Sequence, residues 1–362
     1  MRLVLSVVIA SVSLSTLVVA QASPRPPVPV DAIPAIVDAF RSHDVVAMSD
    51  GRVHGDAAFH TFLLKVLRDP RITATMNDVV LECCNARYQE IADRFTSGEQ
   101  VEQKQLVLTW RNSTQVNAGQ RDGESVIEVL RAIRDANASR PPNRRIRVLL
   151  ADPPIDWNAV HSAADHRTWI ETRDTFPADL IAREVVGRGR KALVIYGGMH
   201  LQRKNIAANY ESAGLAATLI STLEQATGTR AFTVWFPHDL AALEPAAATW
   251  PAASLVTVGG TRLGTIDFAR FVTNALPRIR MRDGKPDFAA GPIPRDQWRS
   301  LPMEQQFDAV MHLGPPSTLT VAPLDPDVCG DTDFMPILRA RMTIVGLTPE
   351  IQRLDRLCGP GR

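Results

Sequence analysis

Two histidines in glycine-bearing turns are the residues of this sequence best suited to chemistry. His54 lies within the turn Asp50–Gly55, and His200 directly follows the two glycines of Gly197–Met199. Glycine allows sharp turns and close backbone approach, so we expect both imidazole rings to face a cavity. An imidazole changes its charge near neutral pH, which suits general acid–base catalysis as well as metal binding. A surface or capping histidine is the alternative for His54 and the preferred interpretation of His60.

Carboxylates and an arginine supply partners for these rings. Glu82 ends a short apolar run, and a carboxylate in such a place must be paired, bound to a metal or hydrated. A structural ion pair with Arg87 or Arg94 is the alternative to a functional role. Arg173 and Asp174 open a helix, where the guanidinium can stabilise an oxyanion or phosphate and the aspartate can cap or orient. Taken alone, that pair is an ordinary charge pair at a helix N-terminus.

Two further aspartates have equally good structural and functional interpretations. Asp152 and Asp156 follow a β-like run and lie beside two prolines. They could be metal ligands or acid–base groups, and they could equally cap turns. The weaker histidine candidates are His161, His166, His238 and His312. The sequence contains no GxSxG elbow, no P-loop and no HExxH zinc motif.

Apolar, β-like runs precede the main candidates. The runs cover residues 44–48, 79–81, 146–150 and 192–196, and each continues into a carboxylate or an imidazole. Ligands of open α/β sheets bind outside the carboxyl ends of the strands, because loops and helix starts converge there. The recurrence therefore predicts one polar pocket built from segments that are far apart in the sequence.

The alternation of strands and helices predicts an α/β fold. We expect a mainly parallel central sheet with crossover helices on both faces and helical insertions. The expected strands cover residues 44–48, 78–82, 146–151, 191–196, 230–236, 254–258 and 307–311. The expected helices cover residues 30–40, 57–68, 88–95, 101–110, 124–138, 174–186 and 212–225. Residues 281–301 are expected to form a loop, and the polar connection 111–123 could carry a lid.

The N-terminus has the pattern of a secretory signal. Met1-Arg2 precedes a long run of apolar and small residues, and Ala20-Gln21-Ala22 supplies a small-x-small cleavage site. We expect residues 1–22 to be removed by cleavage after Ala22. Cleavage after Ala20 is one alternative, and an uncleaved membrane anchor is the other. Residues 23–29 would be a proline-rich leader outside the fold, and residues 30–362 a single α/β domain. Export to the periplasm or the exterior follows, with no stable membrane span after cleavage.

The charge balance excludes classes of partner. Lys and Arg number 40 against 39 Asp and Glu, a formal net charge of +1. No global field therefore favours nucleic acid or an acidic membrane surface. The expected partner is a small-molecule or peptide substrate.

Four cysteines would meet an oxidising environment after export. Cys329 and Cys358 could pair, and closing that loop would be worth roughly 3 kcal/mol. Cys83 and Cys84 are neighbours at a strand end, where regular alternation would point them to opposite faces. We therefore expect two buried small hydrophobes and not a redox pair.

Taken in order, several segments resemble the superfamily of erythromycin-esterase-like, ChaN-like haem-binding uptake and Tiki-type proteins. The family's opening Gly-Glu-x-His-Gly turn is similar to Gly51–Gly55, and its strand ending in Glu is similar to Val80–Glu82. Its helix start is similar to Glu171–Asp174, and its Gly-x-x-His turn to Gly197–His200. Its closing strand is similar to Phe307–His312. The resemblance covers residues 44–312, and the order of these short motifs is more specific than any one of them.

The resemblance implies a pocket and a choice of chemistries. Arg52 replaces the first glutamate of the family pattern, and Asp50 could substitute for it on a different spacing. Some members hydrolyse esters or peptides, with or without a metal, and others bind haem. The implied pocket is formed by His54, Glu82, Arg173 and His200, with Asp50 beside them.

Three functional hypotheses remain open from the sequence. The first is an exported hydrolase in which His54 or His200 is the general base and Arg173 stabilises the oxyanion. In its metal-assisted form, a divalent ion would activate the water, and its ligands would be Asp50, His54, Glu82 and His200. The second hypothesis is a haem or small-ligand binding protein, with a histidine or Tyr88 as axial ligand. The third is a relative with neither activity.

Overall fold

The computed structural model describes residues 23–116, 124–207, 217–272, 280–282, 285–287, 292–321 and 326–358. The predicted signal peptide, residues 1–22, lies outside the described residues, as does most of the predicted lid. Within the described ranges, no helix is both long and apolar enough to cross a membrane.

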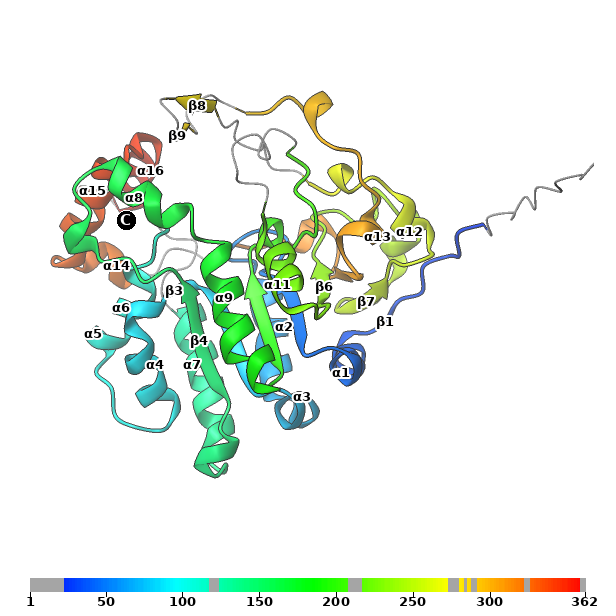
Figure 1. Cartoon of the computed structure of the whole chain (residues 1–362), viewed down its shortest axis with the longest axis horizontal. Coiled ribbons are helices and arrows are strands. Elements are labelled where there is room, and N and C mark those ends of the chain that lie inside the picture. The colour runs from blue at the N-terminus through cyan, green and yellow to red at the C-terminus, as the bar shows by residue number, and fades with distance from the viewer. Residues whose placement is uncertain are drawn as a thin grey trace, which may run out of the picture.

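An eight-stranded sheet forms the centre of the molecule (Figure 1). Its strand order is β1-β7-β10-β6-β2-β5-β3-β4. The strands are β1 (Val30–Asp31), β2 (Val45–Ser49), β3 (Asp78–Asn85), β4 (Arg147–Asp152), β5 (Ala192–Tyr196), β6 (Phe232–Trp235), β7 (Ser254–Thr257) and β10 (Ala309–His312). All neighbours from β10 to β4 pair in parallel, whereas β7 is antiparallel to both β10 and β1. The prediction of a mainly parallel α/β sheet is confirmed.

Most predicted helices form within a few residues of their expected bounds. The helices are α1 (Ala32–Ser42), α2 (Ala57–Arg68), α3 (Pro70–Thr75), α4 (Gln89–Thr96), α5 (Gln103–Leu106), α6 (Leu108–Arg111), α7 (Glu124–Asn137), α8 (Ala163–Ile170), α9 (Thr175–Glu184), α11 (Leu219–Thr227), α12 (Arg262–Thr265), α13 (Met303–Gln306), α14 (Pro326–Gly330), α15 (Phe334–Val345) and α16 (Thr348–Cys358). The single helix expected over 101–110 is instead the pair α5 and α6. The expected loop 281–301 contains part of a small hairpin, β8 (Arg280–Arg282) and β9 (Lys285–Asp287).

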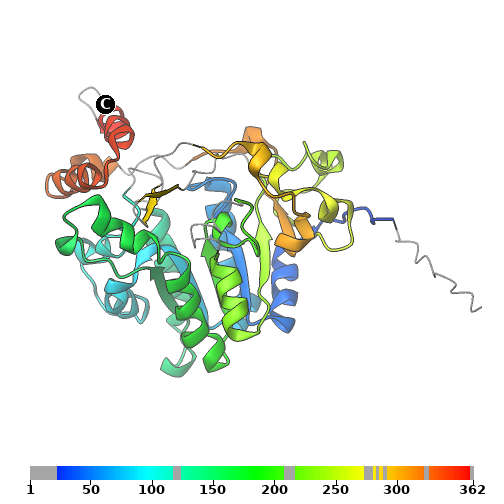
Figure 2. The same cartoon turned by 45° about the horizontal axis from the view of Figure 1, so that its top comes forward.

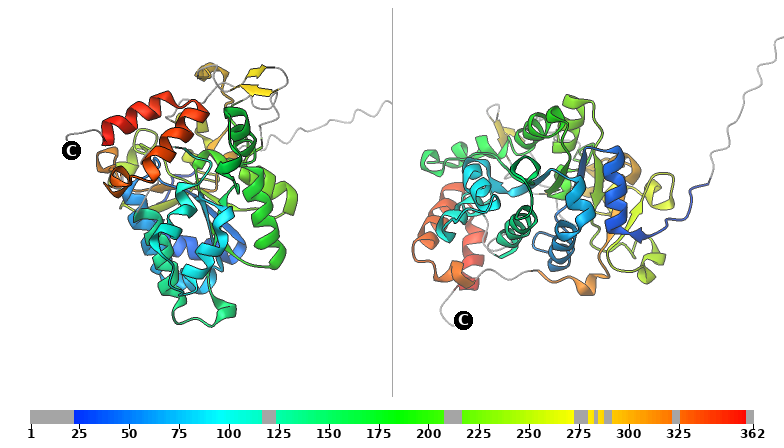
Figure 3. Two further views of the ribbon diagram at one scale, coloured as in Figure 1. Left: turned by 90° about the vertical axis from the view of Figure 1, so that its left-hand side faces the viewer. Right: turned by 90° about the horizontal axis from the view of Figure 1, so that it is seen from below.

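The strand side chains alternate between two hydrophobic clusters. On β3, Val79 and Leu81 belong to a cluster with α1, α2, α4 and α7, whereas Val80 belongs to one with α9 and α11. Period-two alternation of a strand explains the division. Helix α2 buries one face at helical spacing, as its sequence predicts, through Phe59, Phe62, Leu63, Val66 and Leu67. Figure 3 shows α2 and α7 side by side.

The C-terminal helices α15 and α16 lie near α8, at the side of the molecule away from β1 (Figures 1 and 2). A disulfide joins Cys329 to Cys358 and closes this helical segment, as the sequence suggested. Cys83 and Cys84 are also joined by a disulfide, so the expectation of two unpaired hydrophobes is wrong. The β3–β4 register shifts between Leu81 and Asn85, so the regular alternation assumed for the two neighbours does not hold there.

The predicted leader is partly incorporated in the fold. Arg25 donates its backbone N–H to Gly260 and accepts from the N–H of Arg262. Pro27 is buried. The expectation that residues 23–29 lie outside the fold is therefore wrong for this part, because an extended chain gains backbone partners beside residues 260–262.

Candidate functional site

A cavity of about 430 Å³ lies at the carboxyl ends of the central strands. Its walls come from Glu82 of β3, from the last residues of β2 and β6, and from the segments after β2, β5 and β6, together with Gln115 and Arg173. Parallel strands bring segments far apart in sequence to one edge, as expected for this fold class. The predicted residues that line the cavity are Asp50, His54, Glu82, Arg173 and His200.

Glu82 is the best-buried acid of this group, with 3 % of its surface exposed. Its Oε1 accepts from Arg173 Nη2 at 2.5 Å and from Gln115 Nε2 at 2.9 Å. Its Oε2 accepts from the backbone N–H of Gly197. The predicted alternatives Arg87 and Arg94 pair elsewhere, with Asp156 and Glu99 respectively. The ion pair of Glu82 therefore spans the cavity wall and is not a local surface pair.

His200 is held by Asp174. The Nδ1 atom of His200 lies 2.8 Å from Asp174 Oδ1, which also accepts from the backbone N–H of Leu219 at 2.7 Å. The Nε2 atom lies 3.9 Å from Glu82 Oε1, and the ring meets Tyr196 edge-on at 5.3 Å between centroids. Burial alone would lower the pKa of His200, but the Asp174 and Glu82 carboxylates outweigh burial and raise the pKa above its ordinary value.

His54 has a matching arrangement with Asp50. Its Nδ1 atom lies 2.5 Å from Asp50 Oδ2. Gly51 between them has φ of 104°, and a Cβ there would come within 2.8 Å of Asp56 Cβ, so the turn requires glycine. Asp50 thus supplies the carboxylate beside His54, as the sequence suggested it could.

Arg52, which stands where the family pattern has glutamate, makes a buried ion pair with Asp56. Its Nε lies 2.7 Å from Asp56 Oδ2, and its Nη2 lies 3.0 Å from Oδ1. Its Nη1 donates to the carbonyl of Pro315 and to Thr318 Oγ1, both at 3.2 Å. The guanidinium therefore anchors the turn to residues 315–318.

Three of these side chains converge at Gly197. A Cβ built there would lie 3.1 Å from Glu82 Oε2, 3.3 Å from His200 Cδ2 and 3.5 Å from His54 Cε1. The absence of a side chain at this position allows both rings and the carboxylate to approach one another. Two histidine–aspartate pairs and a glutamate–arginine pair therefore meet at one wall of the cavity.

Arg173 connects Glu82 to a second buried acid. Its Nε lies 3.8 Å from Asp152 Oδ1 and, among the described residues, has no hydrogen-bond partner. Asp152 accepts from the backbone N–H of Thr114 at 2.6 Å and from its hydroxyl at 2.5 Å. Burial raises the pKa of Asp152 to about 6, although Arg173 and Thr114 oppose this shift. Asp156 has the turn role, because it accepts from the N–H of Asn158 at 3.0 Å.

The predicted metal arrangement is not assembled. Within the part of the chain that the structure describes, no group of three or more His, Cys, Asp or Glu side chains could hold a metal ion. Arg173, Gln115 and the Gly197 N–H donate to Glu82, while aspartates hold the Nδ1 atoms of both histidines. The assignment of Asp50, His54, Glu82 and His200 as metal ligands stays a prediction.

Tyr88, the predicted haem ligand, is not among the residues that line the cavity. Its hydroxyl accepts from Asn112 Nδ2 at 2.7 Å. Tyr88 follows β3 by three residues, in a 3-10 turn (η1, Ala86–Tyr88) that packs against the hydrophobic cluster of α4 and α7. The cofactor role of Tyr88 stays a prediction.

Sequence reasoning missed Gln115 and Thr114, which reach the two buried carboxylates from one segment. Both lie in the polar connection 111–123, whose only signal was its polarity. It also missed the backbone N–H of Gly197 as a donor, although the double glycine pointed to that turn.

Comparisons with known proteins give distant likenesses. No family model matches the chain, and no curated protein matches it. A Bacillus cereus protein of solved structure gives a TM-score of 0.43 at 10% identity, over 83% of this chain and 97% of that one. A succinoglycan biosynthesis protein gives 0.42 at 9% identity, over 80% and 94%. ChaN of Campylobacter jejuni, in a structure described as cofacial haem binding, gives 0.35 at 12% identity, over 56% and 85%. The structural neighbours of this α/β chain thus include a ChaN protein, at scores that carry no argument about its function.

Proposed function

We propose that this chain is a hydrolase that cleaves an ester or amide, with His200 as the general base that activates water. The observation that carries the proposal is the His200–Asp174 pair, 2.8 Å apart, beside the Glu82–Arg173 ion pair at the wall of the cavity. A base fixed through Nδ1 presents its Nε2 in a defined direction, and a neighbouring cation can receive developing negative charge.

The proposed reaction uses these groups in order. His200 Nε2 accepts a proton from water as the water oxygen attacks the carbonyl carbon, and Asp174 stabilises the resulting imidazolium. Arg173 stabilises the oxyanion, and Glu82 holds Arg173 in place. The intermediate collapses, the bond to the alcohol or amine breaks, and the proton passes from the imidazolium to the leaving group. His54, held by Asp50, is the second acid–base group at this wall.

Replacing His200 tests the proposal. His200→Ala should lower kcat/KM by about a thousandfold, because the general base is lost. The free energy of unfolding should change by less than about 1.5 kcal/mol, since one hydrogen bond is removed. The measurement is turnover of a panel of chromogenic esters and amides, with chemical denaturation alongside. His161→Ala, a change of the same type at an exposed position, is the matched control.

Two results would contradict the proposal. One is a large loss of stability in His200→Ala, which would make His200 a structural residue. The other is turnover that survives the substitution. Turnover that is lost in His54→Ala but retained in His200→Ala would move the role of base to His54.

Export and substrate class stay proposals that accompany this function. We propose that a single α/β domain acts in the periplasm or outside the cell on a small molecule or peptide, after removal of residues 1–22. N-terminal sequencing of exported protein checks the cleavage site. A chain that retains Met1 in the cytoplasm would contradict the export proposal.

Haem binding has less support from the geometry. The polar cavity has a Glu82–Arg173 ion pair at its wall, and Tyr88 does not line it. Titration of the exported protein with haemin, followed by absorption spectroscopy and elemental analysis, tests whether the protein binds haem. A Soret band that is lost in His54→Ala or His200→Ala would favour the binding function over hydrolysis.

A further inference from the structure

A second, apolar cavity of about 100 Å³ adjoins the polar one. Helices α2 and α7 form one side of it, and the ends of β3 and β5 form the other. Its apolar walls are Phe59, Leu63, Leu81, Val126, Val129 and Ile195. Ligand pockets are lined mainly by apolar side chains, so an apolar cavity beside a polar site can receive an apolar group of a ligand.

The exposure of the side chains on β3 and β5 shows where this cavity meets the hydrophobic cluster. Val79 and Leu193 lie in the same hydrophobic cluster as Leu81 and Ile195 and are fully buried. Leu81 and Ile195, which are partners across β3 and β5, retain 5 % and 6 % exposure. Along β3 and β5 the cluster is thus closed at Val79 and Leu193 and slightly open at Leu81 and Ile195, directly before Glu82.

The two cavities share part of their lining. Asp50 and Glu82 contribute to both. A molecule whose carbonyl lies against Arg173 and His200 can therefore extend an apolar group past Glu82 into the second cavity. Polar groups also occur at this cavity, where His60 Nε2 meets Glu128 Oε2 at 2.5 Å between α2 and α7.

We propose that the apolar cavity is the subsite for the acyl group of the substrate, and that it selects a short or branched aliphatic chain. This inference rests on the proposed hydrolase. The polar alcohol or amine part of the substrate then occupies the larger cavity, whose lining is mostly polar. An engineered cavity of about 150 Å³ admits benzene, so one of about 100 Å³ suits a group of roughly four or five carbons.

Binding of methyl ketones tests the subsite without requiring turnover. Ketones carry the carbonyl but cannot be hydrolysed, so the series from acetone to 4-methyl-2-pentanone and 2-octanone reports binding alone. Affinity, measured by calorimetry or ligand-observed NMR, should rise by about fourfold for each methylene buried and then stop rising when the cavity is full. Equal affinities across the series would overturn the proposal.

Three variants sharpen the test. Val129→Phe fills the cavity and should abolish the gain from chain length, whereas Val28→Phe, the same change at a position that is 68 % exposed, should leave the gain intact. Leu63→Ala enlarges the cavity and should shift the optimum to longer chains, which keeps the test decisive if Val129→Phe does not fold. A chain-length preference that survives Val129→Phe and is unchanged in Leu63→Ala would place the apolar group elsewhere.

The two proposals can fail separately. Chain-length-dependent ketone binding without turnover of any ester would support the subsite and overturn the hydrolase. Turnover that requires His200 but shows no chain-length preference, in rate or in ketone binding, would support the hydrolase and overturn the subsite.

Discussion

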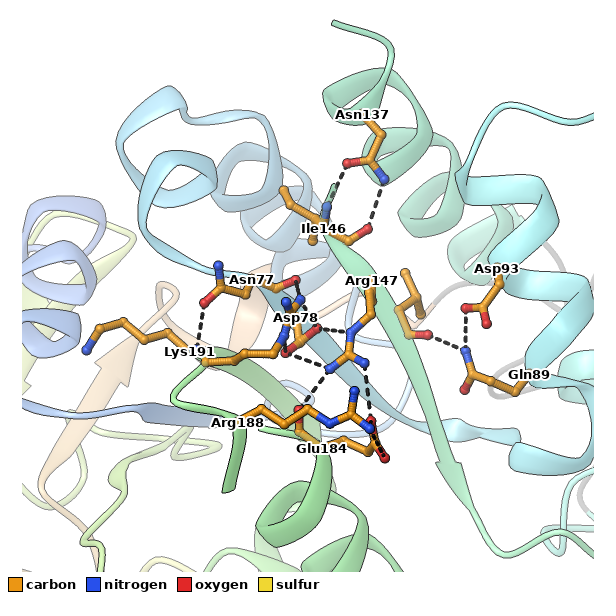
Figure 4. A network of polar contacts seen from close by, with 12 residues as sticks. Asn77, Asp78, Gln89, Asp93, Asn137, Ile146, Arg147, Glu184, Arg188 and Lys191 are labelled. Atoms are coloured by element: carbon orange, nitrogen blue, oxygen red, sulfur yellow. Dashed lines mark hydrogen bonds and ion pairs between the residues drawn. The ribbon is translucent and has the colours of Figure 1, made fainter. Parts of the chain in front are cut away.

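Strand β3 carries two buried acids, one at its first residue and one in its middle, and the two acids are compensated in different ways. Asp78 begins the strand and is fully buried. Arg147 and Arg190 each make two hydrogen bonds to its carboxylate, at 2.7–3.3 Å, and Figure 4 shows Arg147 beside Asp78. Glu82, four residues later, has one arginine, one amide side chain and one backbone N–H, and it faces two cavities.

The difference separates a structural carboxylate from a candidate functional one. Two arginine forks satisfy both oxygens of Asp78, and Arg147 also binds Glu184, so the charges at this end of the sheet compensate one another. Around Glu82, a single cation lies between Glu82 and Asp152, and two histidines lie nearby. Sites that perturb pKa values and open to a cavity are where chemistry is most often found.

The largest expected effect is on stability, at the Asp78 end. Asp78→Asn should lower the free energy of unfolding by about 3 kcal/mol, because it leaves two arginines without their shared anion. Chemical denaturation measures this loss. Activity per folded molecule should stay unchanged. A variant that is stable but inactive would show that Asp78 is not a purely structural carboxylate.

The matched change at Glu82 should affect activity instead. Glu82→Gln should lower kcat/KM by about a hundredfold, or ~2.7 kcal/mol of transition-state stabilisation, because Arg173 loses its orienting charge. Its cost in stability should stay below about 1.5 kcal/mol, since Asp152 remains near Arg173. Ester turnover and denaturation of the same sample measure both. A loss of stability as large as that of Asp78→Asn, with turnover intact, would show that Glu82 is a structural carboxylate like Asp78.

Asp174→Asn should reduce the rate by about tenfold and move its pH dependence. Asp174 and Glu82 together raise the pKa of His200, so the acid-side fall of the wild-type rate should lie at a higher pH than the ordinary histidine pKa would give. Without the Asp174 charge, that fall should move to lower pH, because His200 then holds its proton less tightly. The measurement is the pH–rate profile of the wild type and of Asp174→Asn. If the acid limb of the profile lies at the same pH in both proteins, His200 is not the general base.

The smallest expected effect concerns Asp152. Its pKa is raised from 3.8 to about 6, so the stability associated with this carboxyl is present below about pH 4 and is lost as the pH rises through about 6. Thr114→Val removes a hydrogen bond that favours the charged form. The variant should therefore lose about 1 kcal/mol at pH 7 and much less at pH 4. Equal losses at the two pH values would show that the Thr114 hydroxyl does not act on the charged form of Asp152.

Much of the fold could be predicted because it depends on local patterns. The periodic apolar face of α2 and the β-like runs of β2 and β5 have their expected types, with bounds within a few residues. The break in β3 could not be predicted, since its register shift depends on how it pairs with β4. That shift is why the disulfide between Cys83 and Cys84 was missed.

The sequence by itself determined which residue types stand at the strand ends, and the glycine turns that let His54 and His200 approach a cavity. Only the tertiary structure decided their partners. Arg173 and not Arg87 pairs with Glu82, Gln115 joins them, and an apolar cavity opens beside them. The physical reason is that hydrogen bonds and voids depend on distances of a few ångströms between segments far apart in the chain. Those distances are set by how the crossover helices pack on the sheet.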